Sequence, residues 1–537
     1  MLLHDDRLFP ADPVTRGIAR RLFATVRDLP IISPHGHTDP RWYAENNAFP
    51  DPATLFVKPD HYIFRMLYSQ GVRLEQLGIP RKDGAPVETD PRKIWQLFAS
   101  HWHLFRGTPT RLWFEHAAST IFGVNERLTS ENADRIYDKI AAKLEEPELR
   151  PRALFERFNI EAISTTEGAL DDLKWHDMVR DSGWSGKVVT AYRPDSVVDP
   201  EFEGFAENLE KLGELTGEDI GSWTGYLAAH RQRRGYFKKR GATSSDHGHA
   251  TARTANLSDA DAEKLYAKIL KGKVSAKDAD LFRGQMLTEM AKMSLDDGLV
   301  LQIHPGSWRN HNAALFEQFG RDMGCDIPTA TNYVEALKPL LDAVGNEPNL
   351  TVIAFTLDET SYSRELAPLA GHYPALRLGP GWWFLDAPEA MLRFRELTTE
   401  TAGFYNTVGF NDDTRAYLSI PARHDVARRV DCAYLAKLVA EHRLDEDEAA
   451  EMLQLLEVCV ARAVPQRTTW FLSRCCTGWQ AQPRDQRCLW GHRRREIAAR
   501  GRRCCSIVAD IGSRASRASR QSHAPAGLRN SALLRVC

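Results

Sequence analysis

Short apolar runs recur along about 460 residues of the chain, and each ends in polar or glycine-rich residues before an amphipathic stretch begins. These runs predict β-strands at residues 30–33, 162–165, 187–191, 299–303, 350–355, 376–378 and 407–410. The intervening stretches predict helices at 262–270, 279–293 and 333–344. Strands that alternate with helices indicate a parallel sheet covered by helices, and seven or eight such units in this length predict a closed barrel with insertions.

The stretch after the first predicted strand differs, because residues 41–149 carry mostly helical pattern and many aromatic side chains. We therefore predict an α/β fold, a distorted TIM-type (β/α) barrel with a helical insertion after the first strand. In domain terms, residues 1–40 hold the N-terminal segment and the first strand, 41–150 form the insertion, and 151–463 form the remainder of the barrel.

The segment 464–537 is a different kind of sequence, because the hydrophobic periodicity stops there. After Gln466 the chain has 15 Arg, no Lys and three acidic residues, a net charge of +12, whereas the rest of the chain carries −14. We interpret this aberrant Arg- and Cys-rich tail as a coding region read out of frame. A disordered basic tail is the main alternative. A metal or nucleic-acid module is disfavoured, because adjacent cysteines lack the two-residue gap of a zinc knuckle.

Composition limits the location and the partners of the chain. No run of about 18 apolar residues exists, and the N-terminus lacks the apolar segment of a secretory signal. Only Cys325, Cys432 and Cys459 precede the tail, which indicates a reducing compartment. We expect a cytoplasmic protein that binds neither membrane nor nucleic acid; a homo-oligomer is compatible with the sequence.

Ionisable and aromatic side chains stand just after the predicted strands, where a barrel of this kind collects its chemistry. They are His35, His37, Glu167, Arg193, His304, Trp382, Trp383, Asp413 and Arg415. Residues two apart on a strand point to the same face, so the imidazoles of His35 and His37 can converge on one metal ion. The first and last strands of a closed barrel are neighbours, and Asp413 is therefore the natural third ligand, or a base.

Other candidates have a functional and a structural interpretation. In Asp60-His61-Tyr62, His61 and Tyr62 could transfer protons, but chemistry alone favours a packed aromatic pair beside a solvated aspartate. Arg193 and Arg415 could each grip a carboxylate with two hydrogen bonds. The alternative is a structural ion pair, with Asp195 for the first arginine and Asp412 for the second.

The remaining motifs are weaker when each is taken alone. Ser245-Asp246-His247 resembles a nucleophilic triad, but adjacent residues rarely form one, and Asp246 is better interpreted as a polar substrate contact. His304 is either a site residue or a satisfied core histidine. The Gly-Trp-Trp-Phe block at 381–384 is either core packing or a set of aromatic faces for a sugar ring.

Taken together, these motifs resemble one family, the uronate isomerases, a branch of the amidohydrolase superfamily. The matching blocks are His-x-His at 35–37, Asp-His-Tyr at 60–62, Arg-Pro-Asp at 193–195, Ser-Asp-His at 245–247, His-x-Gly-x-x-Arg-Asn at 304–310, Gly-Trp-Trp-Phe at 381–384, Asp-x-Arg at 413–415 and Arg-His-Asp at 423–425. All eight occur in family order over about residues 5–460. Any one block is weak, whereas the ordered set is specific.

The resemblance implies interconversion of D-glucuronate with D-fructuronate and of D-galacturonate with D-tagaturonate. It implies zinc held by His35, His37 and Asp413; the His-x-His pair, one aspartate at the last strand and no obvious bridging lysine predict one zinc per chain. It also implies a substrate pocket whose further residues are His61, Tyr62, Arg193, Asp246, His304, Arg309, Trp382, Trp383 and Arg415. The chain departs from the family at Glu167-Gly168, where two aspartates are usual, at His311, and past residue 460, where a helical C-terminus is expected.

Isomerisation of an aldehyde sugar to a keto sugar moves a proton from C2 to C1 through an enediol. The site therefore needs a base, an electrophile and an anchor for the carboxylate. Asp413 or Tyr62 can be the base; zinc, His61 or Arg415 can stabilise the enediol oxygens; Arg193 or Arg415 can hold the carboxylate. Two rival classes are a zinc hydrolase of the same superfamily and a non-catalytic, degenerate copy.

Overall fold

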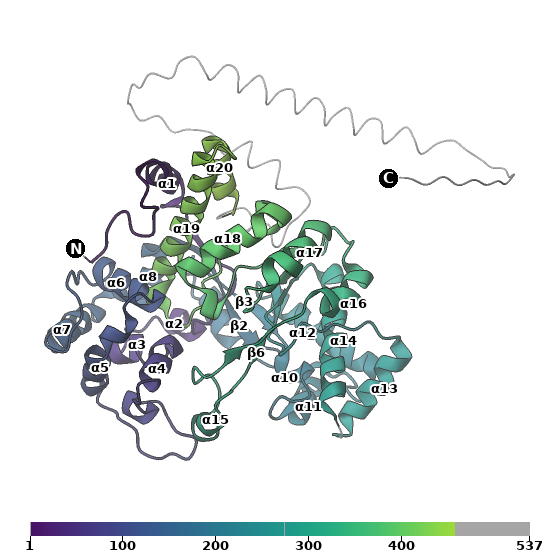
Figure 1. Cartoon of the computed structure of the whole chain (residues 1–537). Coiled ribbons are helices and arrows are strands. Elements are labelled where there is room, and N and C mark those ends of the chain that lie inside the picture. Colours follow the sequence, from purple (N-terminus) through teal and green to yellow (C-terminus); the bar gives the residue numbers. More distant parts are fainter. Residues whose placement is uncertain (1, 273, 457–537) are drawn as a thin grey trace. The chain divides into compact units, whose positions relative to one another are not determined.

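A computed structural model describes residues 2–272 and 274–456 of the chain (Figure 1). Its centre is a sheet of seven parallel strands in the order β1-β2-β3-β4-β5-β8-β9. The strands are β1 (Ile31–Ser33), β2 (Ile160–Gly168), β3 (Lys187–Arg193), β4 (Ser244–His247), β5 (Val300–Ile303), β8 (Val352–Ala354) and β9 (Leu376–Leu378). Two further short strands, β6 (Ser307–Trp308) and β7 (Ile327–Pro328), form an antiparallel pair after β5.

Six of the predicted strands are confirmed, and two features of the sheet differ from the prediction. Strand β4 was missed, because its sequence Ser-Ser-Asp-His has no apolar residue although all four positions are buried. The strand predicted at 407–410 is wrong: only Thr407 pairs with the sheet, through an isolated parallel bridge to Leu378. The backbone N–H of His37 donates to the Thr414 carbonyl at 3.1 Å. The residues that follow β1 therefore contact the residues that follow the Thr407 bridge.

Helices alternate with the strands and cover the outside of the sheet. The predicted helices correspond to α13 (Asp259–Leu270), α14 (Ala276–Asp297) and α16 (Val334–Val344). The others in this part are α9 (Lys174–Asp181), α10 (Asp195–Val198), α11 (Phe205–Thr216), α12 (Trp223–Lys238), α15 (Ala313–Phe319), α17 (Ala367–His372), α18 (Pro388–Ala402) and α19 (Ile420–Ala440). Helix α14 shows why such segments form: Ser275 caps its first turn, and Gly298, with φ +76°, ends it.

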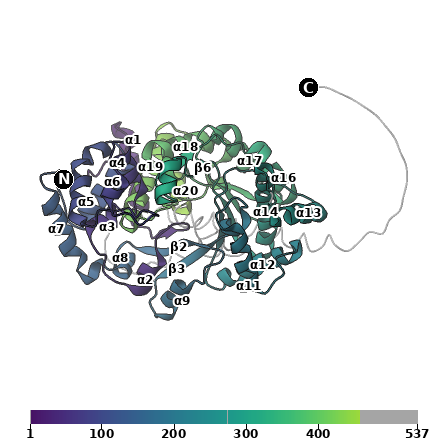
Figure 2. The ribbon, with the colours of Figure 1, turned by 90° about the horizontal axis from the view of Figure 1, so that it is seen from below.

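The predicted helical insertion after the first strand is confirmed. It contains α2 (Pro40–Glu45), α3 (Pro52–Phe56), α4 (His61–Tyr68), α5 (Pro91–Ser100), α6 (Pro109–Thr120), α7 (Ala133–Leu144) and α8 (Pro151–Arg157). Proline begins five of these helices, where its missing N–H costs nothing. Helices α3 to α7 lie together on one side of the described fold, away from α11 to α14 and α16 (Figures 1 and 2).

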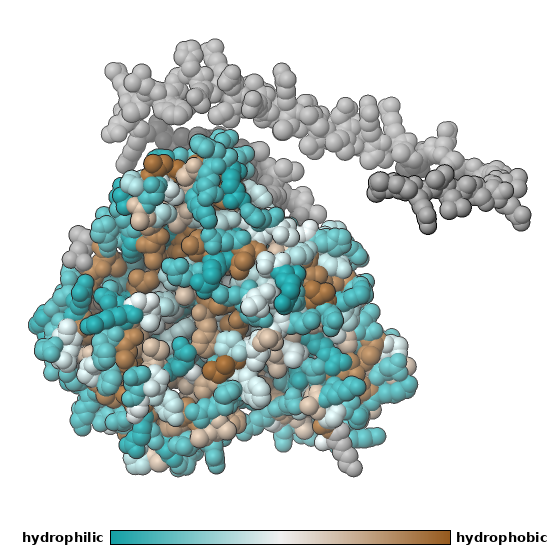
Figure 3. Space-filling view, in the orientation of Figure 1, coloured by the Kyte–Doolittle hydropathy of each residue, from teal (hydrophilic) through white to brown (hydrophobic). Residues whose placement is uncertain are grey.

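Two terminal helices pack against α19, namely α1 (Pro13–Val26) and α20 (Glu446–Gln454). Among the helices that the structure describes, none is long and apolar enough to cross a membrane. On the face in Figure 3, hydrophobic residues are interspersed among hydrophilic ones. The aberrant tail predicted at 464–537 lies outside the described residues.

Candidate active site

A cavity of about 390 Å³ opens where the strands of the sheet end. Apart from Asp246, every site residue predicted from the sequence lines it. These residues are His35, His37, His61, Tyr62, Arg193, His304, Arg309, Trp382, Trp383, Asp413 and Arg415. Asp246 lies directly behind the wall, on β4, and is completely buried.

The cluster predicted to bind a metal does come together. The Nε2 atoms of His35 and His37 lie 3.4 and 3.0 Å from the same atom, Oδ1 of Asp413. The two rings are nearly perpendicular, at 88°, and Nδ1 of His37 lies 2.6 Å from the hydroxyl of Thr166. That contact orients the His37 ring with Nε2 toward the cluster. Burial acts to raise the pKa of Asp413, but the two histidines hold it well below its ordinary value.

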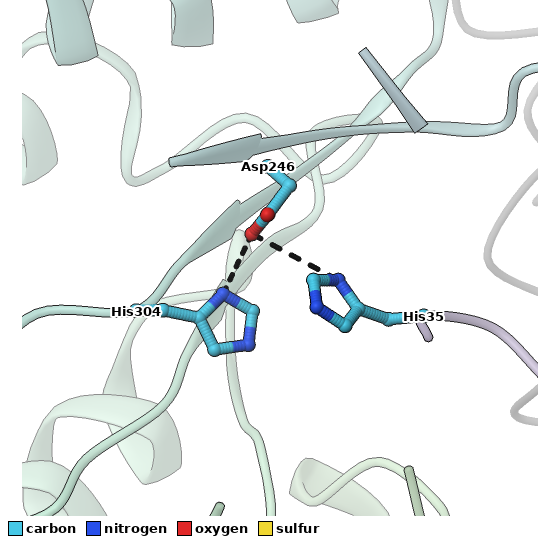
Figure 4. Close-up of side chains that lie close together, drawn as sticks. All are labelled: His35, Asp246 and His304. Atoms are coloured by element: carbon cyan, nitrogen blue, oxygen red, sulfur yellow. Dashed lines mark hydrogen bonds and ion pairs between the residues drawn. The ribbon is translucent and has the colours of Figure 1, made fainter. Parts of the chain in front are cut away.

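His35 also belongs to a second group, with Asp246 and His304, which Figure 4 shows. Oδ1 of Asp246 lies 2.7 Å from Nδ1 of His304 and 3.9 Å from Nδ1 of His35. The other carboxylate oxygen of Asp246 faces Nε of Arg193 at 3.3 Å. Within the described part of the chain, Nε2 of His304 has no hydrogen-bond partner, although the ring is buried. Because His304 also lines the cavity, it is a site residue, although one of its ring nitrogens is bonded as in a core histidine.

The arginines at the strand ends face the cavity and are also ion-paired. Arg193 contacts both Asp246 and Asp195, whose Oδ2 lies 3.1 Å from its Nε, so the structural pair with Asp195 considered from the sequence exists. For Arg415 the expected partner was wrong. Its Nη2 lies 3.0 Å from Asp322, a residue of the loop between β6 and β7.

Arg309 and the tryptophan block form one wall of the cavity. The guanidinium of Arg309 lies 5.9 and 5.7 Å from the ring centroids of Trp382 and Trp383. Its Nη1 donates to Asp326 at 2.8 Å. Both tryptophans are more than nine-tenths buried and belong to a core cluster, so little of either side chain is exposed to the cavity.

Helix α4 brings its first two residues into the site. The side chain of Asp60 accepts a hydrogen bond from the backbone N–H of Tyr62 at 2.9 Å and thereby caps the helix. The Tyr62 hydroxyl donates to the Trp383 carbonyl at 2.9 Å. Burial lowers the pKa of His61 to about 3 and raises that of Tyr62 well above its ordinary value, so both are neutral. The alternative of a solvated aspartate was wrong, because Asp60 is buried.

Several cavity residues were missed by sequence reasoning. Asp195, Arg321 and Asp322 line it, and no motif marked the last two. Arg423 also lines it; the Arg-His-Asp block that contains it was recognised, but its role was not. The Arg423 guanidinium lies 3.6 Å from the ring centroid of Trp113 and forms a buried ion pair with Asp386.

Glu167, where the chain departs from the family pattern, lies beside the site. Its carboxyl accepts hydrogen bonds from the hydroxyls of Thr165, at 2.9 Å, and Thr190. Burial raises its pKa to about 7. The neighbouring Thr166 points to the opposite face and contacts His37, so Glu167 lies behind the strand that supports the histidine cluster.

A curled parallel sheet with a histidine–carboxylate cluster and arginines at the carboxyl ends of its strands defines a (β/α)-barrel enzyme with a candidate metal centre. The family model described as glucuronate isomerase matches residues 13–465. The chain belongs to this family of uronate isomerases.

Individual relatives agree with this assignment. The uronate isomerase of Mesorhizobium japonicum is 69% identical over 461 residues, which cover 86% of this chain and 98% of that protein. That of Brucella canis is 68% identical over 462 residues, which cover 86% and 99%. The crystal structure of glucuronate isomerase from Caulobacter crescentus, 60% identical, matches with a TM-score of 0.85 and covers 87% of this chain and 98% of that one. The activity is thus that of an aldose–ketose isomerase acting on uronates.

Proposed function

We propose that the cavity converts D-glucuronate to D-fructuronate and D-galacturonate to D-tagaturonate by proton transfer between C2 and C1. The observation that carries this proposal is the convergence of two arginines, Arg193 and Arg415, on the cavity that also holds the histidine–aspartate cluster. A uronate presents a carboxylate and, during reaction, a second developing negative charge. The body of the chain carries a net charge of −14, so these local cations must provide the attraction.

We propose one zinc ion at this centre, held by His35, His37 and Asp413. Two imidazole nitrogens and a carboxylate oxygen form a donor set that suits zinc. The Oδ1 atom of Asp413 is buried without a hydrogen bond in the described residues, although two histidine nitrogens face it. Bound there, the metal would supply a Lewis acid for a substrate oxygen. His35→Ala should lose the metal at this centre, whereas Arg193→Ala should keep it.

We assign proton removal to Asp413 and hydrogen-bond donation to Tyr62 and His61. The pKa of Asp413 is held low, so this residue is ionised and has no proton of its own, whereas Tyr62 keeps its proton and already donates to a carbonyl. His61, neutral and stacked on Tyr62 with ring centroids 5.0 Å apart, can donate to an oxygen of the enediol. Tyr62→Phe should therefore slow turnover yet retain exchange of the C2 proton with solvent, and Asp413→Asn should abolish both.

We propose that each of the two arginines, Arg193 and Arg415, binds one of the two negative charges of the reacting substrate. Arg193 is fixed between Asp195 and Asp246, and Arg415 is fixed by Asp322, so each guanidinium is positioned before substrate arrives. His304, whose buried Nε2 has no partner among the described residues, can add a further polar contact. Arg309, Trp382 and Trp383 complete the wall against the sugar.

The experiment that tests the proposal follows the purified, zinc-loaded full chain by proton NMR in D₂O, with each uronate in turn. We expect formation of the keto acid with deuterium incorporated at the exchanging carbon. Turnover of an amide or ester panel without turnover of either uronate would instead support the hydrolase mechanism. Cytoplasmic location and a homo-oligomeric state stay predictions.

A further inference from the structure

A second His-x-His stands at the end of β4, with the same glycine in the middle as the first. It is His247-Gly248-His249, and it was not recognised from the sequence, where Ser245-Asp246-His247 drew attention instead. Asp246 contacts His304 and His35 at the active site. Successive residues of a strand point to opposite faces, so His247 points away from that group. The two histidines therefore belong to a separate cluster.

The third member of this cluster is Asp195, at the start of α10. One potential ligand atom from each of Asp195, His247 and His249 lies within 4.8 Å of the others. The two imidazole rings are 5.6 Å apart between centroids and nearly perpendicular, at 82°. The Nε2 atom of His249 lies 3.9 Å from Oδ1 of Asp195. This arrangement is similar to that of the histidines at the catalytic centre.

The ring nitrogens of both histidines are buried and unpartnered. His247 is 1% exposed and His249 is 5% exposed. Across the described ranges, none of their four ring nitrogens makes a hydrogen bond. Buried polar groups are normally satisfied, and the buried rings of His176, His230 and His424 each contact a hydroxyl or carboxylate through one nitrogen. Burial lowers the pKa of His247 and of His249, which keeps both in the neutral form that binds metals.

Asp195 connects this cluster to the active site. Its Oδ2 pairs with Arg193, while Oδ1 faces His249, and the N–H of Gly248 donates to both oxygens at 3.2 Å. A side chain at position 248 would place its Cβ 2.8 Å from a terminal nitrogen of Arg193, so it would displace this guanidinium. One carboxylate thus links the histidine pair to a substrate-binding arginine.

We propose that Asp195, His247 and His249 bind a divalent transition-metal ion at a second site, distinct from the catalytic centre. Two neutral imidazoles and one carboxylate select Zn²⁺, Co²⁺ or Ni²⁺ over Mg²⁺ or Ca²⁺, which prefer all-oxygen ligands. Water would complete the coordination. The ion fixes the carboxylate of Asp195 and, through it, the position of Arg193. The chain then binds two metal ions in all, one more than the single zinc expected from its sequence.

The test measures metal content of the purified full chain by elemental analysis after loading with Zn²⁺ and removal of free metal. The wild type should bind one equivalent of zinc more than His249→Ala, and also one equivalent more than His37→Ala. The double variant should bind two equivalents fewer than the wild type. His176→Asn is the matched control, since it removes a buried histidine outside both clusters and should retain the wild-type content. Only differences in zinc content between variants are interpreted, because any zinc bound by the cysteines of the tail is the same in all of them.

A cobalt titration tests the same proposal through a second, spectroscopic measurement. Metal-free wild type and metal-free His37→Ala are titrated with Co²⁺, and the visible d–d absorption is recorded. We expect absorption from a saturable site that persists in His37→Ala, and its loss in His249→Ala or, if that variant fails to fold, in His247→Asn. Equal metal content in wild type and His249→Ala, or the absence of any cobalt absorption in His37→Ala, would overturn the proposal. Isomerase activity does not enter either measurement.

Discussion

At the scale of single residues, Asp246 shows how the active site is organised. A fully buried carboxylate is tolerated because Arg193 faces one of its oxygens and His304 faces the other. The same contacts orient both partners toward the cavity. The positions of Arg193 and His304 therefore depend on a buried charge that does not itself line the cavity.

Replacing either arginine by lysine should cost most of the activity. Lysine keeps the positive charge but cannot reproduce the planar two-pronged contact of a guanidinium with a carboxylate. For Arg193→Lys and Arg415→Lys we expect kcat/KM on glucuronate to fall by about two to three decades, about 2–4 kcal/mol, with metal content unchanged. Arg41→Lys, on an exposed turn of α2, is the matched control and should stay near wild type. Near-normal turnover in both test variants would make these side chains structural.

Glu167 should give the protein a pH-dependent stability. Burial raises the pKa of its carboxyl from 4.5 to about 7 in the folded state, so the folded state binds more protons than the unfolded state between these values. The free energy of unfolding should therefore fall as pH rises through this interval. Glu167→Gln, which cannot ionise, should gain on the order of 2 kcal/mol relative to wild type between about pH 5 and about pH 8. Urea denaturation at both pH values measures this, and parallel profiles would contradict it.

At the scale of elements, the cap of α4 couples stability to catalysis, because the helix begins with His61 and Tyr62. Asp60→Ala removes the cap and should cost about 1 kcal/mol of stability. By shifting the first turn it should also lower kcat/KM by about ten- to a hundredfold. Asp60→Asn, which can still cap, should recover most of both losses.

Asp12→Ala provides the comparison for that loss, since Asp12 caps α1 through a 2.8 Å hydrogen bond with the Thr15 N–H. It should lose similar stability in a denaturation experiment while keeping its kinetic constants. Equal effects of the two alanine variants on kcat/KM would show that the cap of α4 has no special bearing on the site.

The sequence predicts elements well where burial and apolar character coincide, as in β2, β5 and β8. It fails at β4, because the buried residues there are polar and serve sites on both faces of the strand. It also fails at 407–410, where Thr407 alone pairs with the sheet. At the site, the histidines and arginines could be predicted because they directly follow the predicted strands. The partner of Arg415, Asp322, could not be found, because it comes from the loop between β6 and β7.

At the scale of the whole molecule, the family match ends at residue 465, just before the Arg-rich segment. We expect deletion of residues 467–537 to leave kcat/KM on glucuronate unchanged and to keep or raise the soluble yield. The reason is that the residues assigned to substrate and metal all lie within the matched part. Activity and circular dichroism of the shortened chain test this; a large loss of activity with the fold intact would assign the tail a function.

The hydrogen bond from the His37 N–H to the Thr414 carbonyl has a consequence for how the enzyme is made. Two histidines from the beginning of the chain meet an aspartate made near its end, so a ribosome has synthesised nearly the whole barrel before the third donor exists. A nascent or clipped chain without Asp413 keeps both histidines yet lacks the complete donor set. The proposed metal can therefore find its complete donor set only after Asp413 has been made and the segments after the first and last strands have met.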